Sequence, residues 1–352
     1  MKIIVYLYFI CILFFCSDLI ADKYSMTERY IALAIQGDLK PALPLLAQVD
    51  SSSSASDQEL AAKFRQRFVE RSESPSAVSG NAFVDKVVAI YRDYWAGALL
   101  QTADRAANGL SLEKKLLESL RIQGSRPFQP TIEEDTSEQL RQAVEAQGFY
   151  VLVESAPPLQ DLLIWQKQRQ MQFEVELTDQ VSSVNVVFIS DFYSLGWKHY
   201  AALGLASTTG WVDQGTLYCV EWVYAEGTET FEVSYLKHES RHLADLERFP
   251  GLSAADLEYR AKLTELAFAT RTQRRLLDDF TVKGAANPES PHAQANHRVT
   301  HDLWRELYGS PFPGGAEAWM TVSRDKVNRA ARRLLVRDTK RVETGDESTA
   351  PL

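Results

Sequence analysis

Residues 228–249, TETFEVSYLKHESRHLADLERF, contain a histidine spacing from which the rest of the chain can be interpreted. Within them, His238, Glu239 and His242 form an H-E-x-x-H pattern. On an α-helix, residues four apart lie on one face, one turn above the other. The two imidazoles would therefore point to one place, at the separation that a tetrahedral zinc ion needs. Glu239 could then act as a general base toward a water molecule on the metal.

The surrounding residues favour a helix at this position. Neither Pro nor Gly interrupts residues 228–249, and the pair Pro250-Gly251, which is typical of a helix end, follows directly. Phe231 and Tyr235 extend an inward-facing stripe at three- and four-residue spacing. The alternative is an ordinary helix whose two histidines are satisfied inside the protein.

A third ligand is expected on the next helix, because catalytic zinc usually takes three protein ligands and one water. Ser253 and Asp256 form a variant of the capping box that opens this helix. Helices joined by a short turn pack antiparallel, so a residue about nine positions beyond the turn lies level with His242. Glu258 is closer to that level than Glu265. We expect Glu258 to be the ligand and keep Glu265 as the alternative; a solvated helix charge is the other interpretation of either residue.

Residues 236–265 resemble the gluzincin group of zinc metallopeptidases. The likeness is carried by His238, Glu239, His242 and the downstream Glu258. In that group two His and a downstream Glu hold zinc, and the Glu inside the motif activates water. The resemblance therefore implies Zn²⁺ as cofactor and a peptide or protein as substrate.

One residue of the motif departs from the group. Zincin motifs generally carry uncharged residues between the Glu and the second His, whereas this chain has Arg241 there. We expect Arg241 to point away from the site, or to pair with Asp245 or Glu247.

Gluzincins also use a downstream His or Tyr to stabilise the oxyanion of the tetrahedral intermediate. Here His292 ends a loop rich in Gly, Pro, Asn and Ser, and Tyr308 lies behind it as a second candidate. His297 and His301 are four residues apart, but no Glu stands between them in a motif and no further ligand is nearby. We interpret this second pair as residues of a helix face.

The amino-acid composition limits the kinds of partner that this protein is expected to bind. The chain has 352 residues, 45% of them hydrophobic, with 38 Lys and Arg against 47 Asp and Glu, for a formal net charge of −9. This length can bury a large core in one or two domains. A nucleic-acid partner would require a basic face, so the acidic balance argues against one.

The N-terminal residues 1–21, MKIIVYLYFICILFFCSDLIA, predict an exported protein. Lys2 precedes an apolar run that has the length of a signal-peptide core and is short for a membrane span. We expect cleavage after Ala21, a periplasmic or secreted protein, and no stable membrane span afterwards. An uncleaved anchor and a start at Met26 are the alternatives. Cleavage would leave Cys219 as the one cysteine, without an internal disulfide, which fits a bacterial envelope.

The fold class expected is α+β. Residues 22–130 read as a helical N-terminal region, with helices over 57–71, 82–107 and 111–120. The Gly- and Pro-containing segment 121–135 marks a boundary. Residues 131–341 then form a zincin-like metallohydrolase domain with a small mixed sheet, the motif helix, the glutamate helix and C-terminal helices.

Within this domain, strands are expected over 149–154, 170–178, 184–189, 203–209 and 217–224, with a turn at 210–215. Either of the last two strands could form the sheet edge beside which a peptide substrate binds. Helices are expected over 294–308 and 314–341, and a disordered tail over 342–352.

The function that this sequence favours is a zinc-dependent hydrolase, most simply a metallopeptidase. Two alternatives remain open at this point. One is a zinc amidase that acts on cell-wall peptides, and the other is a non-catalytic envelope protein with an accidental H-E-x-x-H pattern.

Overall fold

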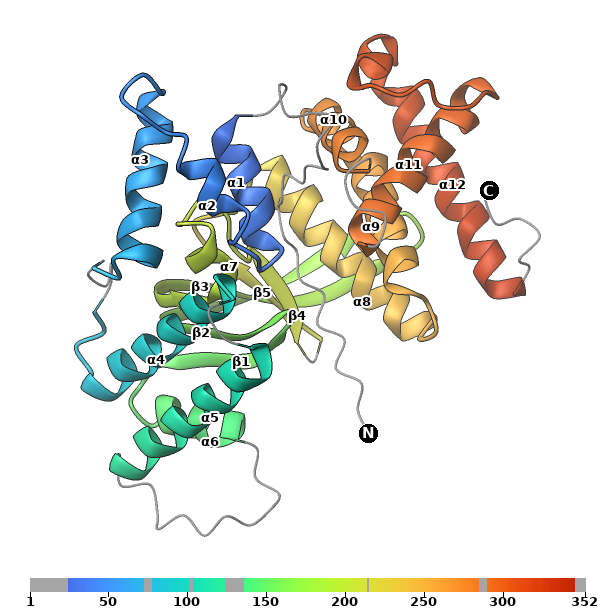
Figure 1. The fold of residues 1–352 in the computed structure, drawn as a ribbon. Coiled ribbons are helices and arrows are strands. Elements are labelled where there is room, and N and C mark those ends of the chain that lie inside the picture. The colour runs from blue at the N-terminus through green and yellow to red at the C-terminus, as the bar shows by residue number, and fades with distance from the viewer. Residues whose placement is uncertain are drawn as a thin grey trace.

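The structure, a computed structural model, describes residues 25–72, 78–101, 104–123, 136–213, 215–284 and 290–345. Three expectations fall outside these residues: the signal peptide at 1–21, the domain boundary at 130, and the tail from 346 to 352. Within the described residues the chain combines many helices with one five-stranded mixed sheet (Figure 1), which confirms the α+β class. No helix in this part of the chain is both long enough and apolar enough to span a membrane.

Helices make up the N-terminal region, as expected. They are α1 (Met26–Ile35), α2 (Ala42–Leu46), α3 (Ala55–Phe64) with a π-helical extension (Arg65–Val69), α4 (Ala82–Leu99), α5 (Arg105–Ile122) and α6 (Thr136–Glu145). The helix expected over 82–107 is wrong near its C-terminal end. Helix α4 ends at Leu99, and Gln101 has a φ of 51°, in the left-handed region that terminates helices. The residues 108 and 109, expected as a helix end, lie inside α5.

The sheet has the strand order β1-β2-β3-β5-β4. Its strands are β1 (Tyr150–Ala156), β2 (Leu159–Glu176), β3 (Val181–Leu195), β4 (Gly210–Asp213) and β5 (Thr216–Val220). β1, β2 and β3 pair antiparallel in sequence order, β5 joins β3 in parallel, and β4 pairs antiparallel with β5. Strands β2 and β3 are longer than the pattern suggested. β2 already begins at Leu159, with a mostly buried run that does not alternate, and β3 continues to Leu195.

The strand expected over 203–209 is wrong. A short helix, α7 (Gly196–Ala201), occupies the chain just before it, and Leu203 and Gly204 have φ values of 55° and 82°. An extended strand cannot accommodate two such residues. The turn expected at 210–215 contains strand β4 instead, and the strand expected over 217–224 ends at Val220 in the sheet interior. The edges of the sheet are therefore β1 and β4, and neither of the two candidates is an edge strand.

The motif segment is helical but not uniformly α-helical. Residues Thr230–Lys237 form a π-helix, and α8 (His238–Arg248) begins at the first histidine of the motif. The hydrophobic spacing did not reveal this change, because Phe231, Val233 and Tyr235 are buried on more than one side of the helix.

Four further helices follow: α9 (Ala254–Phe268), α10 (Gln273–Gly284), α11 (Pro291–Tyr308) and α12 (Arg324–Thr344), with a 3₁₀ turn (Ala316–Thr321) before the last. The tail expected from residue 342 is wrong for its first residues. Helix α12 continues to Thr344, where Gly345 ends it in the left-handed conformation.

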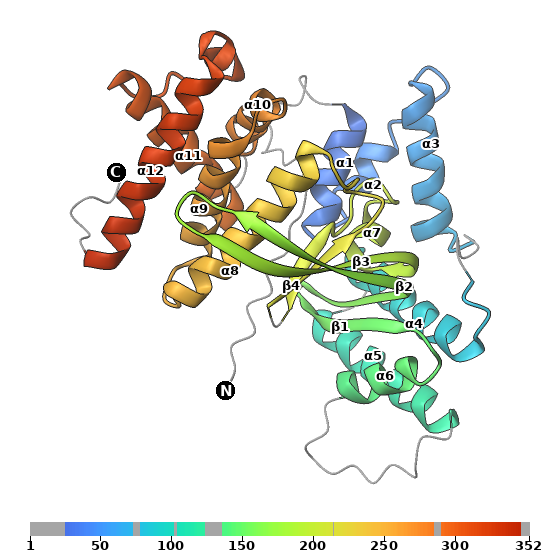
Figure 2. The same ribbon diagram turned by 180° about the vertical axis from the view of Figure 1, so that it is seen from behind.

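The three largest apolar clusters among the described residues hold these elements together. The first joins the N-terminal helices to β1, β2 and α7. The second lies among α9, α10, α11 and α12, and the third lies between the sheet and the π-helical segment with α8. Figure 2 shows the consequence: the sheet lies between the N-terminal helices and the C-terminal helices.

Candidate metal centre

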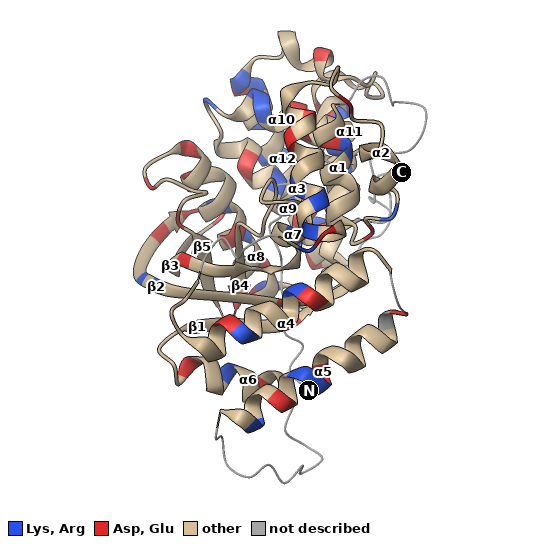
Figure 3. Ribbon diagram, turned by 60° about the vertical axis from the view of Figure 1, so that its left-hand side comes forward, with Lys and Arg blue, Asp and Glu red and all other residues tan. Residues whose placement is uncertain are grey.

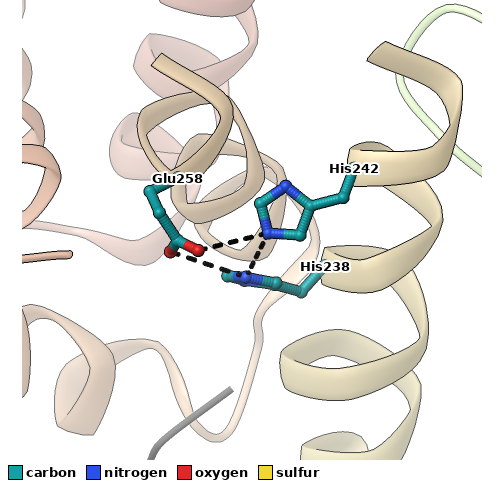
Figure 4. Close-up of side chains that lie close together, drawn as sticks. All are labelled: His238, His242 and Glu258. Atoms are coloured by element: carbon teal, nitrogen blue, oxygen red, sulfur yellow. Dashed lines mark hydrogen bonds and ion pairs between the residues drawn. The ribbon is translucent and has the colours of Figure 1, made fainter. Parts of the chain in front are cut away.

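The motif helix α8 and the glutamate helix α9 bring the expected ligands together. Ser253 caps α9 by accepting a hydrogen bond from the backbone N–H of Asp256 at 3.1 Å, as the capping pattern predicts. The turn before this cap folds α9 back along α8, so that Glu258 lies level with the two histidines (Figure 4).

The side chains of His238, His242 and Glu258, here called the triad, converge on one point. The Nε2 atoms of the two histidines are 3.0 Å apart. Glu258 Oε1 lies 3.4 Å from Nε2 of His242, and Oε2 lies 3.7 Å from Nε2 of His238. All three side chains are buried. The structure thus groups the three expected ligands as a set that could hold a metal ion.

The separations within the triad suit a small tetrahedral ion. Zinc binds His nitrogen and carboxylate oxygen at about 2.0–2.2 Å, which places neighbouring ligand atoms about 3.3 Å apart. The three observed separations, 3.0, 3.4 and 3.7 Å, lie on either side of that value. The donor set of two imidazoles and one carboxylate is also one that zinc uses.

Glu265, the alternative ligand, lies behind His238 rather than in the triad. Its Oε1 atom is 2.7 Å from Nδ1 of His238, on the opposite edge of the ring from Nε2. A carboxylate that accepts from Nδ1–H fixes the tautomer and leaves the Nε2 lone pair directed at the triad. Burial raises the pKa of Glu265 to about 7.

Glu239 lies on the same turn of α8 and is fully buried. Burial raises its pKa well above the usual value, and the nearby charges of Glu258 and Glu265 raise it further. Its Oε2 atom has no hydrogen-bond partner among the described residues. An unsatisfied buried carboxyl oxygen is costly in a folded protein, so its presence one residue from a triad member is typical of a functional group.

Two cationic or potentially cationic groups contact Glu258. Nδ1 of His292 lies 2.8 Å from Oε2 of Glu258, and Nζ of Lys262 lies 3.3 Å from the same oxygen. Burial alone would raise the pKa of Glu258, but His292 and Lys262 hold it well below its usual range. Glu258 is therefore kept ionised, as a metal ligand must be.

His292 and Tyr308 have different places in the structure. Helix α11 carries both, but sixteen residues separate them, and a rise of 1.5 Å per residue makes this about 24 Å. Tyr308 is 48% exposed and contacts Trp304. Only His292 of these two adjoins the triad. His297 and His301 stack on each other farther along the helix, and His301 donates to the carbonyl of His297.

Arg241 points away from the triad and is fully buried in a separate charge network. It contacts Asp179 in the β2–β3 turn and Asp245 at 3.2 Å, which confirms one of the two partners expected on its own helix. Arg260 binds both oxygens of Asp245, at 2.7 and 3.0 Å, and reaches Asp338 of α12 at 3.0 Å. This network fastens α8, α9 and α12 together beside the triad.

A cavity of about 400 Å³ adjoins the triad. Lys262, Glu265 and His292 are among its lining residues, and each of them contacts a triad member. The triad side chains lie just beneath this lining. A molecule in the cavity would therefore be separated from the triad by one layer of side chains.

Sequence reasoning missed Lys262 and the Arg260–Asp245 pair. Both cations lie on α9, where almost every residue from Leu257 to Ala267 is buried. The absence of an apolar stripe on this helix was the available signal, because a helix that is buried on all sides needs internal partners for its charges.

Comparisons with family models, curated proteins and solved structures find no match to this chain.

Proposed function

We propose that this protein is a zinc-dependent hydrolase that cleaves a peptide or related amide bond. One observation carries the proposal: two imidazole nitrogens and one carboxylate from α8 and α9 converge within 3.0–3.7 Å, with the buried Glu239 beside them.

Zinc held by the triad would supply Lewis-acid chemistry, lowering the pKa of water and polarising a carbonyl oxygen. The protein's own part begins with Glu239. Its carboxylate would take the proton of the attacking water and then deliver it to the leaving amine. A base that works near neutral pH benefits from a raised pKa, and burial raises the pKa of Glu239.

His292 would assist from the cavity side. One ring nitrogen lies against Glu258, and the residue lines the cavity, so its ring is placed where it could meet a substrate oxygen. A hydrogen-bond donor in this place stabilises negative charge that develops on the carbonyl oxygen. His292 also separates the cavity from the triad, so its side chain would have to turn aside as a substrate approaches.

The deciding measurement is the metal content of the purified full-length chain, because the 3.0 Å contact between His238 and His242 also suits a hydrogen bond. We expect about one zinc per chain. A chelator should remove it and lower the melting temperature, and added zinc should restore both, since an ion at about a thousand times its Kd stabilises the fold by about 4 kcal/mol.

Activity against peptides is then compared in three variants. Glu239→Gln should retain zinc and lose hydrolysis by about 10²- to 10⁴-fold. His238→Ala should lose both. Glu247→Gln, an exposed residue of the same helix, should change neither. A wild-type protein without bound metal, or a fully active Glu239→Gln variant, would overturn the proposal.

A further inference from the structure

The cavity next to the triad is built from both halves of the chain. One side comes from the N-terminal half and the chain around α7, with Ile35, Pro157 and Lys198. The π-helix and α9 contribute further lining, and α10 supplies Arg275, Asp279 and Lys283. Its lining is thus partly apolar and partly charged, as in a site that holds an extended organic molecule and orients it through a few polar groups.

The charged part of this lining is mainly basic. Four cationic residues, Lys198, Lys262, Arg275 and Lys283, face two acidic ones. This excess contrasts with the chain as a whole, which carries a formal net charge of −9. Basic segments on α10 can be followed in Figure 3.

Both acidic residues are already engaged. Glu265 contacts Nδ1 of His238 at 2.7 Å, and Asp279 lies 3.6 Å from Nζ of Lys283. Lys262 is engaged in turn by Glu258.

Arg275 differs from the other cations of the cavity. It is exposed, and within the described part of the chain its guanidinium donates one hydrogen bond, to Oγ1 of Thr230 at 3.3 Å. Among the described residues no carboxylate pairs with it. A guanidinium has five donors and binds a carboxylate through two of them, so Arg275 could bind a carboxylate in the cavity that it lines.

We propose that this cavity selects a peptide that carries a carboxylate near the bond to be cleaved, and that Arg275 binds this carboxylate. The assignment of such a peptide as substrate rests on the proposed hydrolase function, whereas its binding does not. The carboxylate comes either from an acidic side chain or from the C-terminus of the peptide.

Binding is tested on the Glu239→Gln protein, both with and without added zinc, so that no probe is consumed. The probes are labelled alanine hexapeptides with Glu, Gln or Lys at one central position, each with a free or an amidated C-terminus. We expect a carboxylate to tighten binding by about tenfold or more relative to the neutral probe. The Glu probe with an amidated end and the Gln probe with a free end separate the two sources of the carboxylate.

Arg275→Gln should remove this preference while leaving the neutral probe unaffected. The matched control is Arg274→Gln on the same helix, because Arg274 pairs with Asp278 and does not line the cavity. Lys283→Met provides a second variant on the cavity side and should weaken the preference. Equal binding of all probes, or a preference that survives in Arg275→Gln, would overturn the inference.

Hydrolysis by the wild-type protein separates the two proposals. Cleavage of every probe with the same kcat/KM would leave the hydrolase function standing and refute the selectivity. A carboxylate preference in binding without any cleavage would refute the hydrolase function and leave the binding site standing.

Discussion

Two buried polar clusters lie side by side on the helix pair α8 and α9, and they are built differently. In the charge network, Asp245 receives two hydrogen bonds from Arg260 and one from Arg241, so opposite charges meet in close contact. In the triad, His238 and His242 direct nitrogen atoms at each other and at a carboxylate, so possible metal-ligand atoms converge.

Burial is the same in the two clusters, so it does not tell a structural group from a functional one. The way in which the buried groups are paired does. A buried charge that is paired on all sides holds elements in register and has no capacity left for a ligand. Converging lone pairs are unfavourable unless a cation or a proton lies among them. Helices α8 and α9 therefore carry a structural ion-pair network and a candidate binding site one helical turn apart.

The largest effect on stability is expected from the charge network. Asp245→Ala would leave Arg260 and Arg241 buried without their shared partner, and we expect a loss of about 3–5 kcal/mol in the free energy of unfolding. Denaturant unfolding measures it. The folded fraction should still bind zinc, because the triad is untouched; loss of metal together with stability would show that the two clusters act as one.

A smaller effect is expected behind the triad. Glu265→Gln would remove the carboxylate that accepts from Nδ1 of His238, and loss of such a partner weakens metal binding by about 10- to 100-fold. Competition with a chelator of known affinity gives the value. An unchanged zinc affinity would show that Glu265 does not support metal binding through His238.

A third prediction concerns Glu154, a buried carboxyl in neither cluster. Its two oxygens have no hydrogen-bond partner among the described residues, and burial, with the nearby charge of Asp161, raises its pKa to about 8. Because the folded pKa exceeds the unfolded one, stability is present in full below about pH 4.5 and is lost as the pH rises to about 8.

Glu154→Gln should remove this loss, so that the variant gains about 1.4 kcal/mol over the wild type for each pH unit between the unfolded and the folded pKa. Unfolding curves for both proteins across this range provide the check. Parallel pH profiles would show that Glu154 ionises normally.

The smallest effect is expected at the surface. Arg333 is 52% exposed in its pair with Glu306, which Arg337 also contacts. Arg333→Gln should therefore cost no more than about 0.5 kcal/mol. It is the control for Asp245→Ala, since both substitutions remove one member of an ion pair and differ in burial. A loss of similar size in the two variants would contradict the contrast drawn between buried and exposed pairs.

Local pattern was enough to predict the grouping of the triad. The four-residue spacing of His238 and His242, the break at Pro250-Gly251 and the cap at Ser253 are all short-range features, and together they set the level of Glu258. The α+β class followed from similar signals, because alternation and helical periodicity are properties of neighbouring residues.

The sequence-based predictions were wrong or incomplete where residues distant in the sequence determine the local structure. Residues 203–209 look like a strand by composition, but left-handed backbone at Leu203 and Gly204 follows from how α7 packs against the sheet. The role of Glu265 depended on which edge of the His238 ring it would meet. The partners of Arg260 come from α8 and α12, which no local pattern connects.

The walls of the cavity come from Ile35 at one end of the chain to Asn296 near the other, whereas the triad is contained between His238 and Glu258. A fragment limited to α8 and α9 would keep all three residues of the triad and lose most of the residues that line the cavity. Under the proposed function, the metal donors would come from two adjacent helices, whereas the residues that meet a substrate would come from distant parts of the chain. Changes in the segments that line the cavity, Arg275 of α10 among them, would then alter which molecules bind without changing the metal donors.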